Sequence, residues 1–256
     1  RALLAAAELS SAISDFGYGL QCARQAQQLF QQLGDRRGEI DARLTYCDLA
    51  RYVGELADLQ AQVKEALWMA EQMSYMTGMA KAKQLLAIHI VYTTGESEAA
   101  IQHELSSVAL WRELERPFEL ATALNFLGAD LSELHEYAAS RQALLECRDI
   151  YQSLGYQRGV ALATHNLGCV AQALEEYTRA RELLCDALRI RHHLGLRRGY
   201  AYSFEQLAQV NEREERYEQA VQLWAAAETL RIRIGAPLEY IEQKDQVAAF
   251  PRLRAQ

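Results

Sequence analysis

The chain has 256 residues, half of them hydrophobic, and only three are prolines. That composition is typical of an all-helical protein. The formal net charge of −7 at pH 7 argues against direct nucleic-acid binding, because proteins of that class carry a strongly basic surface.

No apolar stretch approaches the length of a membrane span, and no signal peptide is visible. The five cysteines form no C-x-x-C pair, so they predict small buried side chains in a reducing compartment. These features predict a cytoplasmic protein that does not enter a membrane. The chain opens on Arg1 in sequence that looks like the middle of a repeat, and we expect it to be a piece of a longer protein.

A period of about forty residues runs along the whole chain. At each period an apolar residue is followed by a turn residue, and these junction residues are Gly34, Ser74, Glu115, Gly155, Gly195 and Gly235. Self-similarity at a fixed period of this size is the signature of a stacked array of repeats. Each repeat buries its apolar face only against its neighbours, so the array is expected to form one elongated body.

Each stretch between two junctions predicts a hairpin of two helices. In the fourth stretch, Leu124, Leu127 and Leu131 recur at three- and four-residue spacing and form one helix face, and a second face begins at Tyr137. We therefore expect an all-α, right-handed superhelical solenoid that forms a single domain over residues 1–256. Its hairpins and final capping helix are predicted at residues 1–38, 39–78, 79–118, 119–158, 159–198, 199–236 and, for the cap, 239–250.

The third hairpin is predicted to be the least regular. Its second helix carries Gln102, His103 and Glu104 where the pattern of the other repeats calls for apolar side chains. A local bend or a change of register is expected at this point.

The hairpins resemble the tetratricopeptide repeat, whose motif is W-x₂-L-G-x₂-Y, then A-x₃-F, then P. The positions that carry the resemblance are Leu124, Leu127, Gly128 and Leu144, then Thr164, Leu167, Gly168, Ala180 and Leu184, then Phe204, Leu207, Ala220 and Trp224. The terminal proline is missing, and each unit is longer than the usual repeat of that family. Extended repeats of this kind are similar to those of kinesin light chains, of the Leu-Gly-Asn spindle adaptors and of bacterial regulator arms.

The C-terminal part has a narrower resemblance. The run from Tyr217 to Arg231 and the segment from Ile234 to Leu238 look like the end of the repeat array in large bacterial signalling ATPases of the STAND class. No G-x-x-x-x-G-K-[ST] motif occurs in this chain. Any NTPase activity would therefore belong to a module outside it.

No catalytic or metal-binding constellation is visible. None of the six histidines lies in H-E-x-x-H or beside a cysteine pair, and His192 and His193 point in different directions on a helix. No G-x-S-x-G or G-x-G-x-x-G motif appears. We expect a chain that is not an enzyme and that binds no cofactor and no metal.

The resemblance implies that the first helix of each hairpin lines a concave groove in which a protein or peptide partner binds. Carried over to this sequence, the groove positions are Asp48, Arg51, Tyr52, Gln84, Tyr92, Asn125, Ser132, Glu133, His165, Gln172, Tyr202, Glu205, Gln209, Glu212 and Arg213. The set lacks the two lysines and two asparagines with which chaperone-binding relatives clamp a terminal carboxylate. Binding of a free peptide C-terminus is therefore not supported.

Two functions remain open. The first is a ligand-sensing or partner-binding arm of a cytoplasmic bacterial signalling protein or transcriptional regulator. The alternative is a free-standing scaffold that bridges proteins in a complex. The residues predict neither the identity of the partner nor the oligomeric state.

Overall fold

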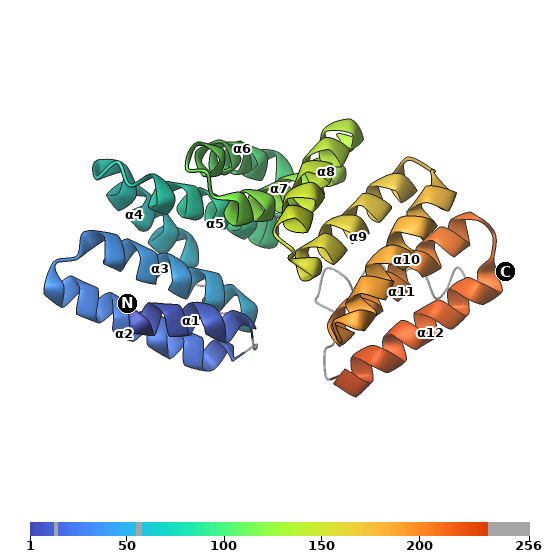
Figure 1. Ribbon diagram of the computed structural model, residues 1–256, viewed down its shortest axis with the longest axis horizontal. Helices are drawn as coiled ribbons and strands as arrows, with labels where there is room; N and C mark the ends of the chain where they lie inside the picture. The colour runs from blue at the N-terminus through green and yellow to red at the C-terminus, as the bar shows by residue number, and fades with distance from the viewer. Residues whose placement is uncertain (13–14, 55–57, 235–256) are drawn as a thin grey trace. The chain divides into compact units, whose positions relative to one another are not determined.

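The structure is a computed structural model that describes residues 1–12, 15–54 and 58–234. Within these residues the regular structure is entirely helical, which confirms the predicted all-α class (Figure 1). The helices are α1 (Ala2–Ala12), α2 (Phe16–Leu33), α3 (Arg36–Ala50), α4 (Leu59–Gln72), α5 (Met76–Thr94), α6 (Ser97–Glu113), α7 (Pro117–Glu133), α8 (Tyr137–Ser153), α9 (Gln157–Ala173), α10 (Tyr177–His193), α11 (Arg197–Arg213) and α12 (Tyr217–Ile234), with a short 3-10 helix, η1 (Arg51–Val53), after α3. The predicted capping helix at 239–250 lies outside the described residues.

The helices group into two compact units, the first from Arg1 to His135 and the second from Glu136 onward. In each unit, helices that follow one another in the chain pack against one another. First helices of neighbouring hairpins also touch, as α1 with α3, α3 with α5 and α9 with α11. This is the packing of a helical-hairpin array. That the array acts as a single domain stays a prediction.

The junctions predicted from the period are the turns between hairpins. Gly34, Gly155 and Gly195 adopt φ of 69°, 67° and 67°, and Ser74 and Glu115 adopt φ of 49° and 52° at the equivalent places. A residue in this left-handed conformation ends a helix and lets the chain reverse, and glycine adopts it without a steric penalty. The repeat therefore fixes the backbone of its turns even where the glycine is replaced.

Small residues in the first helices allow close helix contacts, as the repeat pattern predicts. A Cβ atom at Gly168 would lie 2.8 Å from Cγ of Leu184 and 3.4 Å from the carbonyl oxygen of Ala180 on the partner helix α10. Ala87 and Ala208 occupy the same place in other hairpins and are fully buried. Close packing of this kind leaves no room for a larger side chain.

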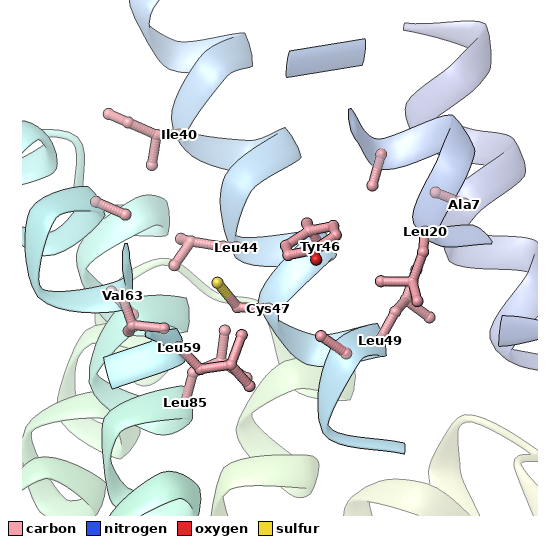
Figure 2. Close-up of a cluster of buried hydrophobic side chains, with 14 of the residues drawn as sticks. Ala7, Leu20, Ile40, Leu44, Tyr46, Cys47, Leu49, Leu59, Val63 and Leu85 are labelled. Atoms are coloured by element: carbon pink, nitrogen blue, oxygen red, sulfur yellow. The ribbon is translucent and has the colours of Figure 1, made fainter. Parts of the chain in front are cut away.

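The core of the first unit surrounds α3, which packs on both sides. Figure 2 shows Leu44 and Cys47 turned towards Val63 of α4, while Leu49 lies on the side of Leu20 of α2. The bend or change of register expected in the third hairpin stays a prediction. Its second helix, α6, is continuous from Ser97 to Glu113, and Glu104 is buried within it.

Candidate partner-binding site

Four of the predicted groove residues of the first unit meet where α3 and α5 end. The Arg51 Nε donates to Asp48 Oδ1 at 2.9 Å, and Arg51 Nη2 donates to the Tyr52 hydroxyl at 2.5 Å. The guanidinium lies 4.0 Å from the centre of the Tyr52 ring, and Tyr92 adds to the electrostatic stabilisation of Arg51. We call Asp48, Arg51, Tyr52 and Tyr92 the Tyr52–Tyr92 surface.

Contacts within the first unit hold the Tyr52 ring in place, while both tyrosines of the Tyr52–Tyr92 surface remain accessible to solvent. Phe16 of α2 stacks on Tyr52 with ring centres 4.7 Å apart and an angle of 11° between the rings. Burial lowers the pKa of Arg51, but the charge of Asp48 and the hydroxyls of Tyr52 and Tyr92 more than offset that effect, so the pKa rises. Tyr52 and Tyr92 are 49% and 48% exposed. The surface thus presents two half-exposed aromatic rings beside a largely buried guanidinium that is paired with Asp48.

A small apolar hollow of about 20 Å³ adjoins this surface. That is room for about one water molecule, so a bound side chain would rest on the hollow rather than enter it. Burial raises the pKa of the Cys47 thiol in its wall to about 12, and a protonated thiol is a poor nucleophile. The lining residues are Cys47, Arg51, Leu59, Val63, Leu85, Ile88, His89 and Tyr92.

A larger hollow of about 470 Å³ lies in the first unit between α1 and the beginnings of α3 and α5. Asp41 and Tyr75 form part of its wall, and the Tyr75 hydroxyl donates to the Asp41 carboxylate at 2.9 and 3.0 Å. Burial raises the pKa of Asp41 despite that hydrogen bond. This hollow was not predicted from the sequence, because the two residues come from different repeats and match no motif.

The other predicted residues of the first unit are dispersed. Gln84 is half-buried on α5, and Asn125 of α7 is only 7% exposed. Ser132 is half-buried and Glu133 exposed at the end of α7. These side chains therefore add little area to the Tyr52–Tyr92 surface.

A buried pair of carboxyl groups, which sequence reasoning missed, joins α6 to α7. Glu104 and Asp130 are 2% and 9% exposed, and neither Glu104 oxygen has a partner with full hydrogen-bond geometry. Burial, and then the charge of Asp130, raise the pKa of Glu104; burial also raises the pKa of Asp130. Two adjacent buried carboxyls cannot both ionise cheaply, so the pair retains a proton. The signal in the sequence was an acid at an apolar position of the repeat.

In the second unit, the predicted residues lie on α9 and α11 and are largely engaged within the protein. Gln172 Nε2 donates to Gln209 Oε1 at 3.2 Å, which joins the two helices. Trp224 Nε1 donates to Glu212 Oε1 at 2.6 Å. Arg213 is exposed at the end of α11.

Glu205 and Tyr202 both contact Arg231 of α12. Two hydrogen bonds of 2.7 and 2.8 Å join Arg231 to the Glu205 carboxylate. The same guanidinium lies 4.6 Å from the centre of the Tyr202 ring. Glu205 is 7% exposed and Arg231 is 6% exposed, so this ion pair holds two helices together and offers little surface to a partner.

His165 is similarly enclosed. It is 8% exposed, and its Nδ1 lies 3.4 Å from Nη1 of Arg191, which donates to the Gly199 carbonyl at 2.8 Å and the Ser203 hydroxyl at 2.7 Å. Burial, and then the charge of Arg191, lower the pKa of His165 to about 3. A neutral, enclosed imidazole is suited to packing rather than to proton transfer at neutral pH.

The part of the chain that the structure describes contains no group of three His, Cys, Asp or Glu side chains placed to hold a metal ion. Among the same residues, no helix is both long and apolar enough to cross a membrane.

Residues 119–192, from α7 to α10, match the family model of the tetratricopeptide repeat. The resemblance predicted from Leu127, Gly128, Leu167 and Gly168 is thereby confirmed, and repeats of this family are scaffolds for protein–protein interaction. No catalytic family is indicated, and no curated protein matches the sequence.

Solved structures share the fold at low sequence identity. BtubC from P. vanneervenii has a TM-score of 0.68 at 18% identity, over 86% of this chain and 92% of that one. A Rap protein complexed with competence and sporulation factor has a TM-score of 0.69 at 11% identity, over 97% of this chain and 73% of that one. A STAND protein with a tetratricopeptide repeat sensor from Pyrococcus horikoshii has a TM-score of 0.65 at 14% identity, over 99% of this chain and 42% of that one.

Proposed function

We propose that this chain is a non-catalytic, protein- or peptide-binding arm of a cytoplasmic bacterial signalling protein or transcriptional regulator. Its repeats match a family of interaction scaffolds. Its fold is similar to that of a Rap protein complexed with competence and sporulation factor and of a STAND protein with a tetratricopeptide repeat sensor. Any NTPase activity that the arm controls would lie in a module outside this chain.

The Tyr52–Tyr92 surface is the observation that carries this proposal. Aromatic and arginine side chains supply most of the energy in protein interfaces, and they do so best when they are already held in place. Here Phe16 and Asp48 hold the Tyr52 ring and the Arg51 guanidinium, while Tyr52 and Tyr92 remain half exposed. A partner would thus gain contact area without having to order these groups.

The test removes the two aromatic rings and compares the result with the loss of equally exposed apolar groups elsewhere in the same unit. The double variant Tyr52→Ala/Tyr92→Ala should weaken capture of the cognate partner by at least about fivefold, as expected for interface aromatics. The matched control is Leu29→Ala/Leu105→Ala, on the second helices α2 and α6, where the side chains are 48% and 47% exposed. Partners captured from a bacterial lysate are quantified by mass spectrometry.

The melting temperature of each variant shows whether the fold survives, and Tyr52→Phe/Tyr92→Phe retains the rings if the alanine variant unfolds. A control variant that loses the partner while the tyrosine variant retains it would place the binding site around Leu29 or Leu105, away from the Tyr52–Tyr92 surface, and contradict the proposal.

The alternative, a free-standing scaffold, is favoured by one comparison. This chain covers 92% of BtubC, so the fold also occurs in a chain of similar length. The gene that encodes the chain distinguishes the two functions, because a P-loop module upstream in the same reading frame supports the sensing arm.

A further inference from the structure

Two lysines without a counter-ion in the described part of the chain lie on α4 and α5 of the first unit, beside two histidines of α5 and α6. Three of the chain's four lysines lie in this part of the sequence, and two of them, Lys64 and Lys83, form no ion pair or hydrogen bond with any described residue. The third, Lys81, differs: its Nζ donates to the Thr45 hydroxyl at 2.9 Å and lies 3.9 Å from Glu8. Most arginines of the described residues likewise contact a carboxylate or an aromatic ring, as Arg43, Arg141 and Arg231 do.

The unpaired cations are neighbours. Lys64 of α4 acts electrostatically on His89 of α5 and on His103 of α6, and Lys83 also acts on His103. Burial is the larger cause of the lowered pKa of each histidine, and the lysines lower it further. Because α5 packs against both α4 and α6, the four side chains span three adjacent helices. We call this group the α4–α6 cationic patch: its charge comes from Lys64 and Lys83, and the lowered pKa leaves His89 and His103 as neutral neighbours at pH 7.

Exposed aromatic surface lies beside the patch. Trp68 is 59% exposed and follows Lys64 by four residues on α4, so both side chains share one helix face. At the other end, His89 and Tyr92 line the same small apolar hollow. Clustered cations without counter-ions are unfavourable by themselves, and an exposed tryptophan in a soluble unit is typical of an interaction surface.

We propose that the α4–α6 cationic patch, with Trp68, binds an acidic segment of the partner protein that also carries an apolar side chain. This inference rests on the proposed function, in that it supplies the chemistry of the partner. Glutamate or aspartate side chains would supply the missing counter-charge, and the apolar side chain would cover Trp68. A short acidic segment requires only this local patch. A long polyanion such as nucleic acid would also meet the remainder of a chain whose net charge is −7, which opposes its binding.

The experiment uses the whole chain and a short fluorescein-labelled peptide in which glutamates surround one leucine. Fluorescence anisotropy should show binding at low salt that weakens as salt is added, because exposed charge pairs are screened. The same peptide with glutamine in place of glutamate should not bind. The variant Lys64→Glu/Lys83→Glu should weaken binding by about tenfold, as expected when two exposed pairs become repulsive.

The matched control, Arg36→Glu/Arg158→Glu, makes the same change of charge at two exposed cations at the beginnings of α3 and α9. Its affinity for the peptide should lie within about twofold of the parent's. The comparison is made with enough salt to screen the general effect of the changed net charge. Lys64→Ala/Lys83→Ala, with its melting temperature, replaces the charge-reversed variant if that variant unfolds.

Three results would overturn the inference: no binding of the acidic peptide, equal loss in both charge-reversed variants, or equally tight binding of a single-stranded oligonucleotide of the same charge. If the peptide fails to bind while partner capture still depends on Tyr52 and Tyr92, only the acidic character of the partner is wrong. If the peptide fails to bind and partner capture is also independent of the two tyrosines, both this inference and the proposed function are wrong.

Discussion

Each unit buries one pair of ionisable side chains between neighbouring helices, and the two pairs differ in charge. The first unit encloses two carboxyls, Glu104 and Asp130, which meet without a cation and retain a proton. The second encloses the Glu205 carboxylate with the Arg231 guanidinium and joins them by two hydrogen bonds. The carboxyl pair contributes less stability as pH rises, because both of its groups then ionise. The ion pair of the second unit requires both of its charges.

A repeated position explains how the second unit came to contain buried arginines. Near the end of each second helix, the forty-residue period brings one residue into the core. In the first unit that residue is Phe30, Ala70 or Trp111, and in the second unit it is Tyr151, Arg191 or Arg231, all of them buried. The apolar members need only close packing, while each arginine requires hydrogen-bond acceptors around it. This position of the repeat therefore accepts either an apolar residue or an arginine, provided that the neighbouring helix supplies hydrogen-bond acceptors for the arginine.

The largest expected effect comes from breaking the ion pair of the second unit. Glu205→Ala would leave the Arg231 guanidinium buried without its carboxylate, and we expect a loss of about 3–5 kcal/mol in the free energy of unfolding. Urea unfolding followed by circular dichroism measures it. The paired replacement Glu205→Leu/Arg231→Met removes both charges and should be far less harmful, since apolar groups of similar size often substitute for a buried pair. Equal losses in the two variants would show that the second unit depends on shape rather than on charge.

The pair in the first unit should respond in the other direction. Its raised pKa values mean that the folded chain holds a proton that the unfolded chain releases above the ordinary carboxyl pKa. The contribution of the protonated pair to the free energy of unfolding is thus complete below about pH 4.5. It is lost as pH rises above that value. Glu104→Gln, which cannot ionise, should be near neutral at pH 4.5 and should stabilise the chain by on the order of 1–3 kcal/mol at pH 8.

Urea unfolding at the two pH values provides the measurement, and Glu182→Gln, at an exposed site of α10, is the control for a general change of charge. A gain for Glu104→Gln that is the same at both pH values would mean that the pair does not hold a proton.

The sequence predicted the features that depend on a single repeat. The turn positions at Gly34, Ser74 and Glu115 and the close contact at Gly168 follow from local backbone conformation and side-chain size, both of which the period displays. Burial of the candidate site residues was not predictable in the same way. His165 and Glu205 occupy groove positions of the repeat, but Arg191 and Arg231, each 26 residues further along the chain, enclose them.

The Tyr52–Tyr92 surface lies at another place in the repeat, near the ends of first helices. There Arg51 pairs with its own neighbours Asp48 and Tyr52. The place of His165 and Glu205 is buried even without an arginine, because Asn125 is only 7% exposed although its second helix carries Tyr151. The groove residues left accessible are therefore those near the helix ends, such as Tyr52 and Tyr92.

The smallest expected effect concerns the turns, where the units also differ. The second unit places glycine at its junctions, Gly155 and Gly195, while the first has Gly34 at one junction and Ser74 and Glu115 in the same left-handed conformation at the other two. A side chain there is disfavoured sterically, and glycine removes that strain but gains more freedom in the unfolded chain. Ser74→Gly and Glu115→Gly should therefore each stabilise the chain by about 0.5–1 kcal/mol, and Gly155→Ser should destabilise it by a similar amount. Urea unfolding of the three variants tests this difference, and destabilisation by both glycine substitutions would mean that the Ser74 and Glu115 side chains contribute more to their turns than the backbone conformation costs.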